Sequence, residues 1–149
     1  MSTIFLFGTS HDKPIPDEVL TLVEKSVHGN RFIIGDAPGF DTKMQDFLLK
    51  LGVKDVTVYT SYAQPRYIPA NSGWNVVALD VSEFPVGSKE FLERKDIAMC
   101  KEADYGICAI LSNGSKASRR NIDRMHESNK KVYIRLIWGL ILNRKTPFA

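Results

Sequence analysis

Short apolar runs alternate along the chain with stretches in which apolar residues recur at helical spacing. Continuous apolar or β-branched runs are typical of buried strands, and they lie at residues 3–7, 31–34, 55–59, 105–111 and 131–136. Helices are expected between Pro16 and Gly29, between Gly39 and Gly52, and at residues 89–102 and 116–129. This order predicts one α/β domain over residues 1–149, with an open parallel sheet and helices on both faces.

Residues 60–88 interrupt this alternation. They hold three prolines, several aromatic residues and one short apolar run at 75–79, which is expected to be an additional strand. A connection of this length in a compact domain is functional or disordered, and its aromatic content argues against disorder. We expect a lid or one wall of a pocket, in which Tyr62 and Trp74 either stack on a ligand base or pack in the core.

Residues 137–142 are strongly apolar. A segment of this kind is expected to pack on its own domain or on a second subunit, and we therefore expect a homodimer. No apolar run approaches the roughly 20 residues that span a bilayer, so no membrane association is expected.

The composition limits which binding partners and which cellular compartment are expected. The net charge of +3 is too small to indicate nucleic-acid binding without a clustered patch. The densest basic cluster follows residue 115, and it is either a solvated helix face or an anion site: Lys116, Arg119, Arg120 and Arg124. The two cysteines show no disulfide framework or zinc spacing, and the amino terminus lacks the features of a signal peptide, so we expect a cytoplasmic protein without a metal.

Three turns that follow predicted strands are rich in small and polar residues. Since the carboxyl ends of parallel strands share one edge of a sheet, these turns are expected to meet there and to bind a ligand. Glycine allows the backbone to approach a phosphate, and a helix amino terminus attracts an anion. The ligand-binding residues expected in these turns are Gly8, Thr9, Ser10, Gly35, Gly39, Ser112, Asn113, Gly114 and Ser115.

Two common phosphate-binding signatures are absent. The turn from Gly35 to Gly39 lacks the G-x-G-x-x-G dinucleotide pattern, and Lys116 lacks the upstream glycine of a G-x-x-x-x-G-K-[ST] loop. The sequence therefore argues against nicotinamide enzymes and P-loop ATPases, and no cofactor is expected.

The chain resembles the SLOG superfamily at several motifs. These are residues 8–10, 35–41, 93–95 with Met99, 103–104 and 113–115. The superfamily includes the lysine decarboxylase-like phosphoribohydrolases that activate cytokinins (the LOG proteins) and the DNA-processing protein A domain. The resemblance implies a Rossmann-like domain of about five main strands, often a dimer, which binds a nucleotide or a related ligand.

The phosphoribohydrolases carry an arginine and a lysine on a helix, as Arg94 and Lys95 do here. A guanidinium group can hold phosphate in a bidentate manner, so Arg94 and Lys95 are expected phosphate ligands, although a surface salt bridge is the alternative for Arg94. The glutamate of that family's later turn falls on Ser118. A serine cannot stabilise an oxocarbenium-like sugar, so a different carboxylate would be needed.

Asp36 and Asp41 are the candidate catalytic carboxylates at the predicted ligand edge. Asp41 also lies in the first turn of a helix, where a carboxylate interacts favourably with the helix dipole. Asp96 is expected to pair with a basic neighbour. His11 could contact the ligand or act as an acid or base.

The sequence thus predicts a protein that binds a small nucleotide-like ligand at the carboxyl edge of a parallel sheet. If the protein is an enzyme, it is expected to cleave or transfer at an N-glycosidic bond, as a nucleoside monophosphate N-glycosidase (a hydrolase) or a deoxyribosyltransferase does. One alternative is a nucleotide sensor without turnover. Another is a protein that binds single-stranded nucleic acid, which would require an outward-facing basic helix beside exposed aromatic residues.

Overall fold

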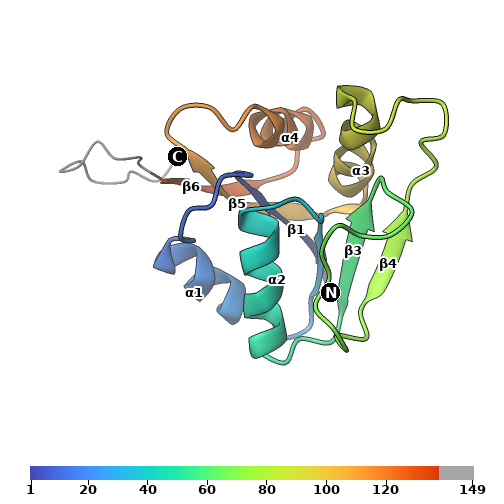
Figure 1. The fold of residues 1–149 in the computed structure, drawn as a ribbon. Helices are drawn as coiled ribbons and strands as arrows, with labels where there is room; N and C mark the ends of the chain where they lie inside the picture. Colours follow the sequence, from blue (N-terminus) through green and yellow to red (C-terminus); the bar gives the residue numbers. More distant parts are fainter. Residues whose placement is uncertain (138–149) are drawn as a thin grey trace.

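The computed structural model describes residues 1–137, and most of the apolar segment 137–142 lies outside the described residues. Figure 1 shows strands and helices that alternate along most of the chain. The strands are β1 (Thr3–Gly8), β2 (Arg31–Ile34), β3 (Val56–Thr60), β4 (Asn75–Ala78), β5 (Tyr105–Leu111) and β6 (Val132–Ile137). The helices are α1 (Asp17–Lys25), α2 (Phe40–Lys50), α3 (Lys89–Glu102) and α4 (Lys116–Glu127).

The strands form one parallel sheet in the order β4-β3-β2-β1-β5-β6. This is a Rossmann-like α/β fold with six strands. The additional strand is β4, because the short apolar run within the 60–88 segment pairs in parallel with β3. All four residues of β4 are exposed, since it lies at an edge of the sheet.

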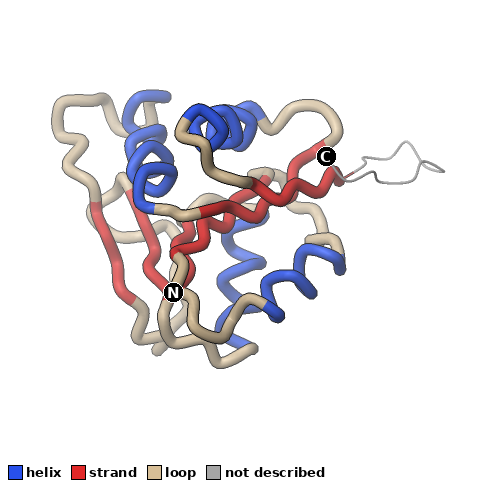
Figure 2. Tube along the Cα trace, turned by 180° about the vertical axis from the view of Figure 1, so that it is seen from behind, coloured by secondary structure: helices blue, strands red, loops and turns tan. Residues whose placement is uncertain are grey.

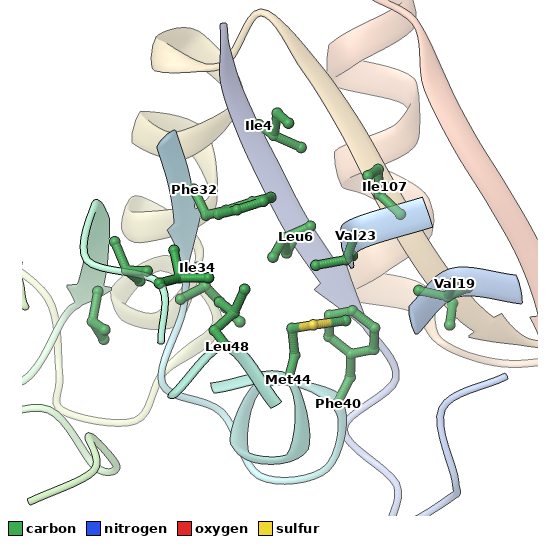
Figure 3. Packing of buried hydrophobic residues seen from close by; sticks show 14 of the residues in the cluster. Ile4, Leu6, Val19, Val23, Phe32, Ile34, Phe40, Met44, Leu48 and Ile107 are labelled. Atoms are coloured by element: carbon green, nitrogen blue, oxygen red, sulfur yellow. The ribbon is translucent and has the colours of Figure 1, made fainter. Parts of the chain in front are cut away.

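Helices cover both faces of the sheet, with α1 and α2 on one side and α3 and α4 on the other (Figures 1 and 2). Successive side chains of β1 enter different cores because side chains alternate across a strand. Ile4 and Leu6 pack with α1 and α2, as Figure 3 shows, whereas Phe5 and Phe7 pack with α3 and α4. The strand is therefore buried on both faces, as its continuous apolar run predicts.

The expected end of the first helix needs correction. We expected Gly29 to close it, but α1 ends at Lys25. The Ser26 hydroxyl donates to the Leu22 carbonyl, and the Asn30 amide donates to the Ser26 carbonyl. These side-chain hydrogen bonds bind carbonyl groups of the helix end, so the chain leaves the helix before it reaches the glycine.

The strand order reverses between β1 and β5. The chain leaves β1 toward α1 on one face and leaves β5 toward α4 on the other, so a crevice forms between the two connections. No helix among residues 1–137 is both long and apolar enough to cross a membrane.

Candidate functional site

A cavity of about 200 Å³ lies at this reversal point, on the α3 and α4 side of the carboxyl end of β1. Its walls come from the turns after β1 and β2, the start of α2, the middle of α3 and the first two turns of α4. The polar residues that line it are Ser10, His11, Asp41, Lys95, Asp96, Ser115, Lys116, Ser118 and Asn121.

Two buried charged side chains meet at Gly35. A Cβ atom on residue 35 would lie 2.8 Å from Oδ2 of Asp41 and 2.9 Å from Nζ of Lys95. The glycine therefore makes room for a carboxylate and an ammonium group. Lys95 is 6% exposed, and its Nζ also lies 3.1 Å from Oδ1 of Asp96.

Lys95 is a fixed cation in the wall of the cavity. Burial by itself would lower the pKa of Lys95, but the charges of Asp96 and Asp41 outweigh burial and raise it. The lysine therefore keeps its proton and provides positive charge in a region of low dielectric, where an anion is attracted strongly.

Asp41 has a pKa well above the usual value of an aspartate. Burial raises its pKa from 3.8 to about 7, although the charge of Lys95 and a hydrogen bond from the Ala37 N–H (3.1 Å) favour the ionised form. A carboxyl group with this pKa exchanges its proton near neutral pH, which is a requirement for a general acid or base.

The amino terminus of α4 also faces the cavity. Residues 115–118 line it, and the first N–H groups of a helix have no partner within the helix. They carry the positive end of the helix dipole. Lys95 and the start of α4 thus bring positive charge to two walls of one cavity, where the carboxyl groups of Asp96 and Asp41 offset part of the charge of Lys95.

Arg119 fixes the turn that precedes α4. Its guanidinium donates hydrogen bonds to the carbonyls of Leu111, Ser112 and Gly114, at 2.7–3.3 Å. Ser115 adopts a left-handed backbone conformation with φ of 55°, and its hydroxyl accepts a hydrogen bond from the Leu111 N–H. The turn is therefore held in place by the protein's own side chains before any ligand binds.

The structure places only some of the expected ligand residues on the cavity. Gly8, Ser10, Gly35, Lys95 and Ser115 line it, whereas Thr9, Gly39, Arg94, Ser112, Asn113 and Gly114 do not. Thr9 and Gly39 shape the surrounding turns. The Thr9 hydroxyl accepts a hydrogen bond from the His11 N–H, and a Cβ on Gly39 would lie 2.6 Å from the His11 carbonyl oxygen.

Asp36 lies beside the cavity and points away from it. Its carboxylate accepts hydrogen bonds from the Thr60 hydroxyl (2.6 Å), the Arg66 N–H (2.8 Å) and the Arg66 guanidinium (2.9 Å). Burial would raise the pKa of Asp36, but the hydrogen bonds from Arg66 and Thr60 outweigh burial and lower it. Asp36 is therefore an ionised anchor for the segment after β3, and of the two candidate carboxylates only Asp41 reaches the cavity.

Arg94 and Lys95 lie on different sides of α3. Arg94 is exposed, and its guanidinium carbon lies 4.8 Å from the centre of the Phe84 ring. One residue in a helix corresponds to a rotation of about 100°, so only one member of this pair can face the cavity.

Tyr62 and Trp74, the two residues expected to stack on a base or pack in the core, do not line the cavity. Trp74 is buried, and its indole N–H donates to the Val53 carbonyl at 3.0 Å, so it packs in the core. Tyr62 packs edge-on against Phe91 and beneath the Arg66 guanidinium.

The three arginines of α4 contact other groups of the protein, whereas Lys116 lines the cavity. In addition to the contacts of Arg119, the guanidinium of Arg124 pairs with Glu93 and donates to Asn121, and Arg120 lies 3.9 Å from Glu93. These pairings reduce the positive charge that α4 can present to a nucleic acid.

Sequence reasoning did not identify Ala37 and Asn121 as cavity residues, and it considered Ser118 only as a missing glutamate. The Ser118 hydroxyl donates to the Gly8 carbonyl at 2.8 Å and so joins α4 to the end of β1. The helical spacing could have indicated both residues, since the polar Ser118 and Asn121 lie on the same buried face of α4 as Ile122 and Met125.

A scan against models of protein families finds no match to this chain, and a search among curated proteins finds no significant similarity. Among residues 1–137, no group of three or more histidine, cysteine, aspartate and glutamate side chains is arranged to hold a metal ion. A function must therefore be argued from the cavity itself.

Proposed function

We propose that the cavity binds the phosphorylated sugar of a nucleotide or a related phosphorylated nucleoside, and that the chain is a SLOG-type protein. The observation that carries the proposal is the arrangement of Lys95 and the amino terminus of α4 on two walls of one cavity at the reversal of strand order. Nucleotides bind at this point in open α/β sheets, and phosphate groups bind at helix amino termini.

The size of the cavity limits which part of the ligand it encloses. At about 200 Å³ it is smaller than the roughly 300–1,000 Å³ of ordinary small-molecule pockets. It therefore holds the sugar and phosphate, while the base extends to the outer surface.

Turnover at the N-glycosidic bond requires a proton donor beside the sugar. When the bond between C1′ and the base nitrogen breaks, the electron pair stays on that nitrogen, which takes a proton from Asp41. Water then adds to C1′ and returns a proton to the Asp41 carboxylate, so that the products are free base and sugar phosphate. The pKa of about 7 suits Asp41 to both steps, and Asp96, which also lines the cavity, is the group proposed to stabilise the developing positive charge on the sugar.

Binding without turnover is the second candidate function. Asp96 is paired with Lys95. Ser118 lies at the position of the family's glutamate, and its hydroxyl donates a hydrogen bond to the Gly8 carbonyl. A site with these pairings can hold a phosphorylated ligand and leave it intact.

The test is to incubate the protein with a panel of nucleoside monophosphates, measure free base by chromatography, and measure ligand binding by thermal stabilisation. The Lys95→Met variant should lose most of the binding. Lys101→Met, an exposed position on the same helix, is the matched control.

Asp41→Asn separates the two candidate functions. If the protein is an enzyme, this variant should retain binding and lose base release, whereas the exposed Asp123→Asn variant should retain both. Stabilisation by a nucleotide without base release in the wild type supports the sensor. The absence of both effects across the panel would contradict the proposal.

A further inference from the structure

Asn121 places an amide group in the wall of the cavity, on the buried face of α4. The residue is only 3% exposed, and the oxygen of its amide has two partners. Oδ1 accepts a hydrogen bond from the Arg124 guanidinium at 2.7 Å and lies 3.5 Å from Sγ of Cys100. Within residues 1–137, no group pairs with Nδ2. Buried donors are rarely left without a partner in proteins, so a group that enters the cavity is expected to accept this hydrogen bond.

Arg124 determines which end of the amide faces the cavity. A guanidinium group only donates hydrogen bonds, so the atom that it contacts is the amide oxygen. Asn121 lines the cavity, whereas Arg124 and Cys100 do not. The oxygen is therefore turned toward these two residues, and the NH₂ group is the end that faces the cavity. Glu93 pairs with the same guanidinium and so helps to hold it in place.

Asp96 provides an acceptor on the neighbouring helix. Figure 1 shows α3 and α4 side by side over one face of the sheet, where they pack against each other. Cys100, which contacts Asn121, lies four residues after Asp96, and residues at this spacing are neighbours on one face of a helix. Oδ1 of Asp96 pairs with Lys95, whereas Oδ2 has no partner in the described part of the chain. This part of the cavity thus offers a donor from α4 and an acceptor from α3.

A hydroxyl group matches this pair better than a phosphate group does. A hydroxyl both donates and accepts hydrogen bonds, so it can bind Asp96 and Asn121 at the same time. An ionised phosphate oxygen only accepts, and the Asp96 carboxylate repels it. The phosphate of the proposed ligand is expected at residues 115–118, and Asn121 lies about one turn further along α4. The sugar is therefore the part of the ligand that reaches Asn121.

We propose that Asn121, oriented by Arg124, is the residue by which the site recognises the sugar hydroxyl next to C1′, with Asp96 as the acceptor. This inference rests on the proposed function, which places the sugar in the cavity and Asp96 near C1′. The hydroxyl next to C1′ is the 2′-hydroxyl. A 2′-deoxy ligand leaves the Asn121 donor unpaired in a buried site, and sites of this kind discriminate strongly against a ligand that lacks the hydroxyl.

The test compares AMP, GMP, CMP and UMP with their 2′-deoxy and 3′-deoxy counterparts. Dissociation constants are measured by calorimetry, and if base release is observed the same comparison is made with kcat/KM. We expect each 2′-deoxy ligand that binds to do so about tenfold more weakly than its ribonucleotide, because the buried donor is then unpaired. The 3′-deoxy ligand should lose less affinity than the 2′-deoxy ligand.

Two variants assign this preference to Asn121 and Arg124. Asn121→Leu removes the donor and keeps the size of the side chain, so the preference for the 2′-hydroxyl should nearly disappear while affinity for the 2′-deoxy ligand changes little. Arg124→Met keeps the amide but no longer orients it, so the preference should fall severalfold. Asp123→Leu, at an exposed position on the same helix, is the matched control and should keep the full preference. Circular dichroism verifies that each variant is folded.

Equal affinity of the wild type for ribonucleotides and 2′-deoxyribonucleotides would overturn this inference and leave the proposed function intact. A preference that the folded Asn121→Leu variant retains would do the same. If Asn121→Leu does not fold, Arg124→Met decides, and an unchanged preference in that variant counts against the inference. Failure of every nucleotide to bind would instead contradict the proposed function, and the inference with it.

Discussion

The ends of the Asp41 and Lys95 side chains both lie against Gly35, and a Cβ atom at that position, 2.8 Å from Oδ2 and 2.9 Å from Nζ, would have to displace both of them. The two residues are separated by more than fifty positions in the sequence, and they come from helices on opposite faces of the sheet. Their meeting point beside the end of β2 gives the cavity its fixed cation and its titratable acid.

The Gly35→Ala substitution should disturb the site more than it disturbs the fold. The new methyl group displaces the ends of the Asp41 and Lys95 side chains, and overpacking of this kind costs about 1–3 kcal/mol. We expect this loss in urea unfolding, together with loss of nucleotide-induced thermal stabilisation. The double variant Lys95→Met and Gly35→Ala should lose less stability than the sum of the losses of the two single variants, because the lysine ammonium group that the alanine methyl displaces is then already absent. Strict additivity would contradict the proximity of these groups.

The pH dependence of stability should reveal Asp41. Its pKa in the folded protein is raised from 3.8 to about 7, so between these values the folded state binds a proton that the unfolded state lacks. The contribution of Asp41 to stability is therefore complete below about pH 4, decreases by about 1.4 kcal/mol per pH unit as the pH rises, and is constant above about pH 7. The measurement is the difference in unfolding free energy between the wild type and Asp41→Asn across this range. A difference that does not change with pH would show that Asp41 titrates normally.

Arg66→Met should destabilise the protein without changing the residues that line the cavity. The substitution removes one hydrogen bond and the counter-charge from the fully buried Asp36, but leaves the Thr60 hydroxyl and the backbone N–H of residue 66. Because the Arg66 side chain is 31% exposed, water screens the pair, and we expect a loss of about 1–2 kcal/mol near neutral pH.

The same variant carries a pH signature. The pKa of Asp36 is lowered in the folded state, so its stabilisation is present above pH 3.8 and is lost as the pH falls through its folded value. The difference between wild type and Arg66→Met should therefore shrink in acid. Arg94→Met, on the exposed side of α3, should have little effect at any pH, and an equal effect of the two variants would rule out a specific role for Arg66.

Trp74→Phe distinguishes core packing from base stacking. The phenylalanine fills most of the same volume but cannot donate to the Val53 carbonyl, so we expect a loss of about 1–3 kcal/mol in stability. Ligand affinity should not change, because Trp74 does not line the cavity. A loss of ligand affinity with unchanged stability would indicate that Trp74 stacks on the ligand base.

Local pattern was sufficient to predict most of the elements. The apolar runs that form β1, β2 and β5 and the helical spacing of apolar residues in α2 reflect which face of each element is buried, and neighbouring residues are sufficient to show this pattern. The sequence also located the turns that meet at the carboxyl edge, because parallel strands bring their ends together. The helix end at Lys25 could not be predicted, since side-chain hydrogen bonds from Ser26 and Asn30 compete there with the expected glycine.

The tertiary structure alone decided which polar residues form the site. Arg94 and Lys95 are neighbours in sequence, but the rotation of α3 relative to the sheet turns only Lys95 inward. Asp36 and Asp41 lie in the same motif but differ in their surroundings. Arg66, thirty positions beyond Asp36, pairs with the Asp36 carboxylate, whereas burial raises the pKa of Asp41 to about 7. The sequence by itself determined the order of the elements and the edge at which their turns gather. The identity and charge state of the groups in the cavity depend on burial and on partners distant in sequence, which exist only once the chain has folded.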